Sequence, residues 1–266
     1  MAERTGLLAF SAAFILGAVD LRLATIPLTL FLMLCAMAPF LPRAGFFFPV
    51  ISRGRTKKQW VALTFDDGPD PASTPLLLDL LAKFRIPATF FVTGQRVTRY
   101  PDLIQEIVKQ GHDVGNHSFH HNRYRMFWQP AILAQEISDT QQVLSKLGIT
   151  PLAFRPPVGI TTPAMGKVLA RQGLYAVNFS CRAFDRGNRQ IEFISKTILR
   201  RIRPDDIVLL HDSNAGDQDR MRRWIVEVEK ILKGISQQGL RAAPLSELTG
   251  RPVMLANRDA NKKQEI

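Results

Sequence analysis

The pattern of apolar and polar residues separates an apolar N-terminal segment from a longer mixed one. From Gln59 onward, short apolar runs alternate with longer amphipathic ones, as in strands alternating with helices. We expect strands at 60–65, 88–92, 112–116, 152–155, 175–179 and 206–211, and helices at 74–84, 101–110, 130–147, 163–172, 191–201 and 219–238. About six or seven βα units in about 200 residues favour an α/β fold with a barrel-like parallel sheet.

The first fifty residues are strongly apolar. Between Arg22 and Arg43 lie 20 uncharged residues, 23–42, which as a helix at ~1.5 Å per residue would match a bilayer core about 30 Å thick. An earlier uncharged run at 5–19 is short for a full crossing, so it would cross with snorkelling flanks or lie in the interface. We predict a membrane region at 1–50. A cleaved signal peptide is the alternative, although no clear small-x-small cleavage site is present.

Basic residues are distributed unevenly around the predicted span. Five follow it closely, at positions 43, 53, 55, 57 and 58, whereas Arg22 stands alone before it. The positive-inside rule therefore places the folded domain on the cytoplasmic face of a bacterial inner membrane. A two-span hairpin with its outer turn at 20–22 satisfies this rule. The alternative is a single anchor with a periplasmic domain.

The chain carries 35 Lys and Arg against 23 Asp and Glu, a formal net charge of +12. Such an excess attracts phosphate-rich partners such as anionic lipid headgroups, a phospholipid-linked substrate or nucleic acid. Nucleic acid is disfavoured because no basic cluster interleaved with aromatic residues is present. Two cysteines and a hydrophobic content of 46% exclude a disulfide-stapled scaffold and a disordered chain.

Two adjacent carboxylates end the first predicted strand. Asp66 and Asp67 follow the run Val-Ala-Leu-Thr-Phe and precede Gly68 and Pro69. Parallel sheets place their sites at the carboxyl ends of strands. Because side chains alternate along an extended chain, the two acids could serve different purposes, one binding a metal and the other accepting a proton. An ordinary Asp-Gly turn with solvated acids is the alternative.

The histidines are clustered. His112, His117, His120 and His121 fall within ten residues, and His211 ends another apolar strand. His117 and His121 are four residues apart, so one helical turn would bring both imidazoles to one face and let them share a divalent cation. Two histidines with one aspartate suit zinc, or cobalt or a similar ion. We interpret His112 and His120 as structural.

Two further segments carry candidate site residues. Arg155 begins the string Arg-Pro-Pro-Val-Gly just past a predicted strand, where an arginine can pair with a carboxylate. Residues 205–212, Asp-Asp-Ile-Val-Leu-Leu-His-Asp, read as a buried strand that delivers His211 to the same edge of the sheet. Each segment alone is also compatible with simple packing or surface charge.

The order of these motifs resembles the NodB-homology polysaccharide deacetylases, also called family 4 carbohydrate esterases. The match covers about 60–248, with Thr-Phe-Asp-Asp-Gly-Pro at 64–69, Ala-Thr-Phe-Phe-Val-Thr-Gly at 88–94, Gly-His-Asp-Val-Gly-Asn-His-Ser-Phe-His-His at 111–121, Arg-Pro-Pro-Val-Gly at 155–159 and Leu-Leu-His at 209–211. The resemblance implies a distorted (β/α) barrel. We expect this domain at 51–250, followed by a polar tail at 251–266.

The resemblance also implies a role for each matching residue. The metal ligands would be Asp67, His117 and His121. Asp66 would act as the general base, oriented by Arg155, and His211 would act as the general acid. The backbone N–H of Val158 would donate a hydrogen bond to the oxyanion. The reaction implied is hydrolysis of the N-acyl amide, above all the N-acetyl amide, of an amino sugar, with a divalent metal ion such as zinc.

The chain departs from the family pattern at three places. Val158 stands where Tyr is usual, and His120 where Ser or Thr is common. In the usual Asp-x-x-Asp-Trp string, Arg182 replaces the first acid and the Trp is missing. The acid that holds His211 is therefore left open. Asp185 is our candidate, and a substrate-facing role for Arg182 is the alternative.

The basic domain and the predicted hairpin favour a substrate held at the membrane surface. Our hypothesis is a membrane-anchored deacetylase of a lipid-linked saccharide or envelope polysaccharide, in which Arg182 and Arg186 could meet a phosphate. The alternative is a catalytically silent saccharide-binding envelope protein that keeps the fold. That alternative predicts loss of a ligand or of the base, whereas all five chemical positions are present.

Overall fold

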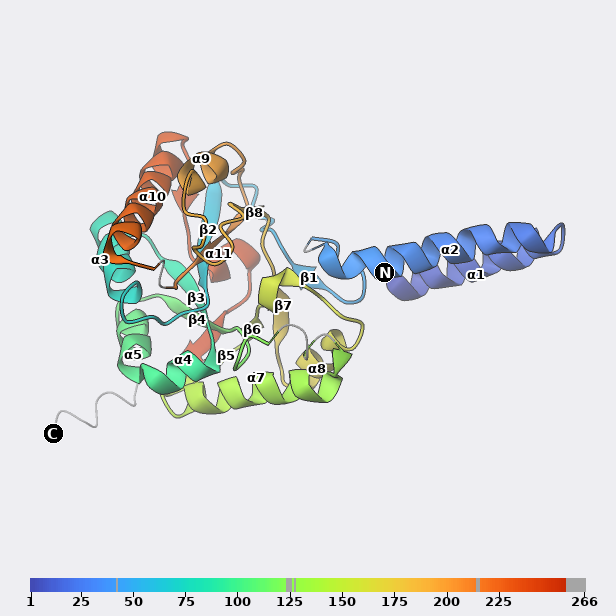
Figure 1. Ribbon diagram of the computed structural model, residues 1–266, viewed down its shortest axis with the longest axis horizontal. Coiled ribbons are helices and arrows are strands. Elements are labelled where there is room, and N and C mark those ends of the chain that lie inside the picture. Colours follow the sequence, from blue (N-terminus) through green and yellow to red (C-terminus); the bar gives the residue numbers. More distant parts are fainter. Residues whose placement is uncertain (42, 123–125, 127, 214–215, 257–266) are drawn as a thin grey trace.

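A curled parallel sheet wrapped by helices forms the body of the molecule, and a helical hairpin projects from one side of it (Figure 1). The computed structural model describes residues 1–41, 43–122, 126, 128–213 and 216–256. The strand order is β1 (Val50–Ile51), β7 (Tyr175–Val177), β6 (Ala153–Phe154), β4 (Asp113–Asn116), β3 (Ala88–Val92), β2 (Trp60–Asp66), β9 (Ile207–His211) and β8 (Cys181–Arg182), and β10 (Arg241–Ala242) also pairs with β2. All these pairings are parallel.

Helices surround the sheet. They are α3 (Thr74–Phe84), α4 (Gly94–Arg99), α5 (Pro101–Lys109), α7 (Pro130–Ser145), α8 (Met165–Arg171), α9 (Ile194–Leu199), α10 (Gln218–Gln237) and α11 (Leu245–Thr249). The central strands are mostly apolar because both of their faces are covered, as in Val61 to Phe65 of β2, where only Thr64 is polar. This is the distorted (β/α) barrel expected from the sequence, so the predicted fold class is confirmed.

The predicted elements match those of the structure to within a few residues at each end, and 74–84 and 88–92 match at both ends. The strands that the sequence pattern does not reveal, such as β8 and β10, are two residues long and therefore carry no periodicity. β11 (Met254–Ala256) pairs antiparallel with β5 (Ile149–Pro151), so this part of the predicted polar tail at 251–266 packs against the domain predicted at 51–250. The rest of the predicted tail, 257–266, lies outside the described residues.

The apolar N-terminal segment forms an antiparallel hairpin of α1 (Ala2–Gly17) and α2 (Leu21–Met37), followed by the short helix η1 (Ala38–Phe40). Gly6 lets the helices approach closely, since a Cβ there would lie 3.1 Å from the Phe31 ring. Within the described part of the chain, Leu21–Phe40 alone is long and apolar enough to cross a membrane. The residue that ends the predicted span, Pro42, lies outside the described residues.

Hydrogen bonds join the hairpin to the barrel and to the connection that follows it. Thr161 N–H, in the barrel, donates to the Pro39 carbonyl at 3.2 Å, and Ala2 N–H donates to the carbonyl of Phe46, in the connection, at 2.9 Å. Arg43 also donates to the Ser180 carbonyl. The hairpin base therefore lies against the loops of the barrel and is not separated from it by an extended linker.

Candidate active site

The chemical side chains converge at the carboxyl ends of neighbouring strands. Asp66 ends β2 and His211 ends β9, and these two residues are paired in the sheet register. On the other side, Asn116 ends β4 opposite Phe154 of β6, so the residues that follow, His117 and Arg155, leave the sheet together. Parallel strands thus bring residues from four parts of the sequence to one edge.

Asp66 and Asp67 do not diverge as the alternation of an extended strand predicts. Asp67 has φ 73°, in the left-handed region, so the strand ends there and both carboxylates turn toward the same space. Asp66 Oδ2 lies 3.7 Å and Asp67 Oδ1 3.6 Å from His117 Nε2. The two acids remain distinct, because only 4% of the Asp66 surface is exposed whereas Asp67 is half-buried.

His117 and His121 come together through a loop, and the helical turn predicted between them is wrong. Ser118 and His121 adopt left-handed φ values of 68° and 56°, which fold the loop back on itself. The two imidazole centroids are 5.0 Å apart. The two imidazoles are therefore close together, as the sequence predicts, but a loop brings them together in place of a helical turn.

Asp67, His117 and His121 fit a divalent metal ion. Their nearest ligand atoms all lie within 4.8 Å of one another, and His121 Nε2 is 3.5 Å from Asp67 Oδ1. That Oδ1 is buried and has no hydrogen-bond partner among the described residues, a costly state that a bound cation would relieve. His117 Nδ1 lies 2.8 Å from the Arg155 carbonyl, which favours the tautomer that leaves Nε2 free to bind.

Charges within this group favour its ligand forms. Burial opposes ionisation of Asp67, but the adjacent His117 and His121 more than offset it and lower its pKa. Burial and the neighbouring His117 lower the pKa of His121, against the opposing effect of Asp67. An ionised carboxylate and a neutral imidazole are the forms that bind metal.

Arg155 holds Asp66 from the side away from the histidines. Its Nη1 donates to Asp66 Oδ1 and to Thr64 Oγ1, each at 2.7 Å. The guanidinium is completely buried, lies 4.0 Å from the Phe91 ring centroid and donates further to the carbonyls of Val177 and Asn178. Asp66 therefore keeps one oxygen fixed and directs the other, Oδ2, toward His117.

Asp185 lies against His211, with Oδ2 2.8 Å from Nδ1. The two residues come from different segments, since Asp185 lies just beyond β8 and His211 ends β9. Burial alone would lower the pKa of His211, but the hydrogen bond to Asp185 and its charge, with smaller effects of Asp67 and Asp66, raise it to about 9. His211 is therefore protonated at neutral pH and can donate a proton from Nε2.

A cleft of about 970 Å³ opens over this group. The predicted site residues Asp66, Asp67, His117, His121, Val158, Arg182, Asp185, Arg186 and His211 all line it. Val158 has φ 52° and is 40% exposed, so no aromatic wall stands at this position. The cleft is large enough for more than one sugar ring.

The remaining histidines do not join the metal-ligand group. His112 is buried beneath β3, where its Nδ1 accepts a hydrogen bond from Ala88 N–H, and burial lowers its pKa to about 4. His120 lies at the rim of the cleft, with Nδ1 2.8 Å from Glu136 Oε1. These contacts agree with the structural roles expected for both.

Two acids that support the site residues, Glu136 and Asp212, were not predicted from the sequence. Glu136 accepts from the N–H groups of Phe119 and His120 and so braces the loop that carries His121. Its signal in the sequence is an acid within the apolar stripe of α7, between Leu133 and Ile137. Asp212 is fully buried next to His211 and gives no comparable sequence signal.

Two supporting hydroxyls hold Asp212. Ser73 Oγ and Thr74 Oγ1 donate to its two oxygens at 2.7 and 2.6 Å. Asp212 N–H in turn donates to the Asp66 carbonyl at 2.7 Å. These bonds link the start of α3 to the ends of β2 and β9.

An aspartate and two histidines face a second acid, which is held by an arginine, and a protonated histidine. This arrangement is typical of metal-dependent hydrolases.

Similarity to known proteins supports the same class of enzyme. The family profile described as polysaccharide deacetylase matches residues 53–177. A peptidoglycan-N-acetylglucosamine deacetylase of Bacillus cereus is 38% identical over 190 residues, which cover 71% of this chain and 87% of that protein.

Two further similarities support the same assignment. A chitooligosaccharide deacetylase of a Bradyrhizobium species is 33% identical over 197 residues, covering 71% of this chain and 90% of that protein. The crystal structure of a peptidoglycan N-acetylglucosamine deacetylase superposes with a TM-score of 0.70 and 27% identity, over 77% of this chain and 94% of that chain. The chain belongs to the polysaccharide deacetylase family. The family and the hydrolase class predicted from the sequence are confirmed.

Proposed function

We propose that the chain is a divalent-metal-dependent N-deacetylase that removes the acetyl group from an N-acetylglucosamine-type saccharide. The single observation that carries this proposal is the convergence of Asp67, His117 and His121 beside Asp66 and His211 in one cleft. The sugars named for the relatives support the substrate class. Because the ligand set and both proton-transfer groups are complete, a catalytically silent saccharide-binding protein is the weaker alternative.

Each protein group has a distinct role in the proposed reaction. A divalent ion held by Asp67, His117 and His121, with zinc or cobalt suited to this ligand set, supplies Lewis acidity to water and to the acetyl carbonyl. Asp66, oriented by Arg155, accepts a proton from the attacking water. The water oxygen bonds to the carbonyl carbon, and the Val158 N–H stabilises the resulting negative charge.

His211 completes the reaction. As the carbon–nitrogen bond breaks, its Nε2 gives a proton to the departing nitrogen, and the products are acetate and an amino sugar. Asp185 on the other ring nitrogen keeps the imidazole oriented and stabilises its charged form. Arg182 and Phe184 at the cleft wall would contact the sugar.

We also propose that the hairpin anchors the enzyme in a membrane, with the barrel facing the cytoplasm. Support comes from apolar side chains exposed on both helices, including Phe14 at 83% and Leu30 at 61%. Such exposure is costly in water and favourable in lipid. The basic residues that follow the span support the orientation. A reporter fused to the carboxyl terminus tests it, because activity restricted to the periplasmic side would contradict this orientation.

The enzymatic proposal is tested on the full chain purified in detergent. We expect zinc-loaded protein to release acetate from N-acetylchitooligosaccharides or peptidoglycan fragments, and a chelator to abolish the release until metal is restored. Asp66→Asn should remove the activity, whereas Asp79→Asn, on the exposed face of α3, should not. Acetate release that survives both the chelator and Asp66→Asn would contradict the proposal.

A further inference from the structure

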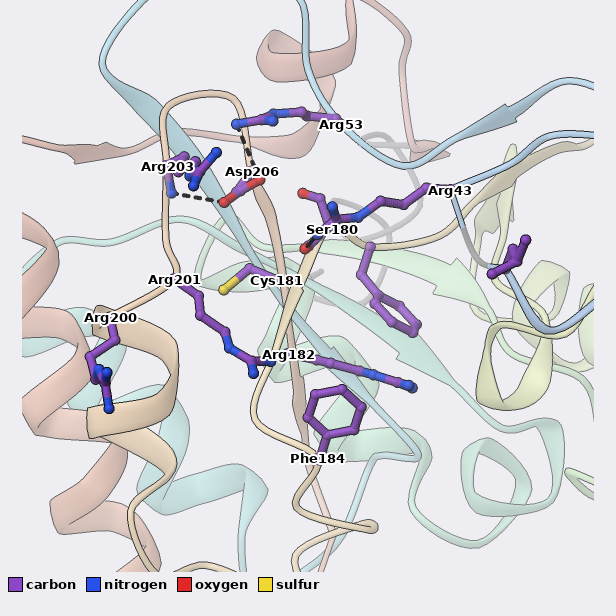
Figure 2. Close-up of a pocket in the computed structure, with 12 residues that line it drawn as sticks. Arg43, Arg53, Ser180, Cys181, Arg182, Phe184, Arg200, Arg201, Arg203 and Asp206 are labelled. Atoms are coloured by element: carbon purple, nitrogen blue, oxygen red, sulfur yellow. Dashed lines mark hydrogen bonds and ion pairs between the residues drawn. The ribbon is translucent and has the colours of Figure 1, made fainter.

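A second cavity, of about 530 Å³, adjoins the catalytic cleft where the chain leaves the hairpin. We refer to it as the arginine cavity. Six arginines line it, Arg43, Arg53, Arg182, Arg200, Arg201 and Arg203, against one acid, Asp206. Figure 2 shows that these arginines come from segments far apart in the sequence: the connection after the hairpin, the segment after β1, strand β8 and the segment after α9.

The positive charge of the arginine cavity is mostly uncompensated. Asp206 is already engaged, since its Oδ1 lies 3.5 Å from Arg53 Nη2 and its Oδ2 accepts the Arg203 N–H at 2.8 Å. Among the described residues, no carboxylate lies within ion-pair distance of the guanidinium groups of Arg182 or Arg201. Like charges gathered without counter-charges indicate a site for an anion.

Three of the cavity arginines, Arg43, Arg182 and Arg201, make contacts that restrict their position. Arg182 lies over the Phe184 ring, 4.2 Å from its centroid, and Arg201 approaches the same ring at 5.6 Å (Figure 2). Arg43 donates one hydrogen bond to the Ser180 carbonyl. Stacking on an aromatic ring leaves the N–H groups at the edge of a guanidinium free, and these groups match the oxygens of a phosphate.

The arginine cavity is continuous with the catalytic cleft. Phe179, Arg182 and Phe184 line both. At the opposite end, Leu41 and Arg43 lie directly after Phe40, the last residue of the apolar segment Leu21–Phe40. The molecule therefore presents, in order, an apolar helix end, a cluster of arginines and the deacetylation site.

We propose that the arginine cavity binds a phosphate or diphosphate ester that links the acetylated sugar to a membrane lipid. The sugar would occupy the cleft, the phosphate would lie among Arg43, Arg182 and Arg201, and the lipid chain would run beside the hairpin. The substrate assignment rests on the proposed function, whereas phosphate binding in the cavity does not. A phosphate could also come from the headgroup of an ordinary bilayer lipid, so the experiment separates these two sources.

Binding is measured first, by titration calorimetry on the full chain in a neutral detergent. N-acetylglucosamine 1-phosphate should bind at least about tenfold more tightly than N-acetylglucosamine, and Arg201→Gln should remove about tenfold of that affinity. Arg222→Gln is the matched control, because the Arg222 side chain on α10 is 78% exposed and is not among the residues that line the cavity. Equal affinities for both sugars, or an equal loss in both variants, would overturn the proposal.

Competition identifies the source of the phosphate. Short-chain phosphatidylglycerol should displace N-acetylglucosamine 1-phosphate only weakly. Displacement at equal concentrations would overturn the proposal, because the cavity would then be a headgroup site. Inorganic phosphate alone should bind in wild type and more weakly in Arg201→Gln. Arg201→Lys, which keeps the charge but not the fork of donors, should fall between wild type and Arg201→Gln.

Turnover then tests the substrate assignment. The kcat/KM for a decyl phosphate ester of N-acetylglucosamine should exceed that for decyl N-acetylglucosaminide, and Arg201→Gln should lower this ratio about tenfold through KM. A ratio near one in wild type would overturn the assignment. If wild type binds the sugar phosphate but hydrolyses neither compound, the proposed deacetylation fails while the phosphate site stands.

Discussion

His211 Nδ1 and Asp185 Oδ2 lie 2.8 Å apart, although the usual first acid of the corresponding family string is replaced by Arg182. The contact forms because β8 pairs with β9 in parallel and carries the following segment across the end of His211's strand. A histidine that is mostly buried thus keeps an acidic partner despite the altered sequence. Because His211 is the proposed proton donor, we expect its protonation state to control activity.

Activity should depend on a protonated His211. Its pKa is raised to about 9, so activity that needs the imidazolium is present below that pH and lost as the pH rises through it. Asp185→Asn removes the hydrogen-bonded charge that holds the pKa up. We expect the basic limb of the kcat/KM profile to move down by at least about one pH unit. An unchanged profile would show that Asp185 does not act through His211.

Zinc should stabilise the folded chain through Asp67, His117 and His121. Ligand at a hundredfold excess over Kd adds about 2.7 kcal/mol to the free energy of unfolding, which a thermal melt of the full chain detects. His117→Ala should abolish this zinc-dependent rise. His120→Asn is the matched control, because His120 lies in the same loop but outside the ligand group. A rise of equal size in His117→Ala would place the metal elsewhere.

Arg155→Gln should be more damaging to stability than Asp66→Asn. Removing the arginine leaves the buried Asp66 carboxylate without its partner, which costs about 3–5 kcal/mol. Asp66→Asn instead leaves a neutral acceptor that still receives a hydrogen bond from Arg155. Chemical denaturation of both variants gives the comparison, and equal stability would mean that the ion pair contributes little.

Asp212 should make stability fall as the pH rises. Burial raises its pKa to about 7, against the opposing hydrogen bonds from Thr74 and Ser73. Because this pKa is higher in the folded state than in the unfolded state, protonation of Asp212 favours the folded state. Its contribution to the free energy of unfolding is complete below about pH 4, near the pKa of an aspartate in the unfolded chain, and is lost as the pH rises through about 7. Asp212→Asn should remove this part of the pH dependence.

The measurement is the free energy of unfolding at pH 5 and pH 8. Wild type should lose more stability between the two values than Asp212→Asn does. Asp79→Asn, on the exposed face of α3, serves as the control and should behave as wild type. If Asp212→Asn shows the wild-type pH dependence, other groups are responsible for it.

Parallel-sheet topology explains why much of the site is predictable from sequence. Once Asp66, His117, Arg155 and His211 are each assigned to a strand end, the shared edge of the sheet follows. The backbone between them does not follow, because the left-handed φ at Asp67 and at His121 has no signal in residue periodicity. Spacing alone therefore predicted a helix where a loop is found.

The contacts that sequence could not predict join distant segments. Asp212 meets hydroxyls about 140 positions earlier in the chain, and the arginine cavity combines residue 43 with residues 182 and 201. Local patterns report on neighbours within a turn or a strand, so they carry no information on such pairings. The arginines could be counted in the sequence, but their convergence could not.

Only nine residues, 41–49, connect η1 to β1. A hydrogen bond from Thr161 to Pro39 fastens the end of the hairpin to the barrel, and a bond from Ala2 to Phe46 fastens the start of α1 to the connection itself. If the hairpin is embedded in lipid, the mouth of the cleft stays at a constant height above the bilayer. The distance of an acetyl group from the membrane would then limit its removal as strongly as binding of its sugar in the cleft does. Acetyl groups far along an extended glycan would escape it, while those next to the lipid surface would be removed.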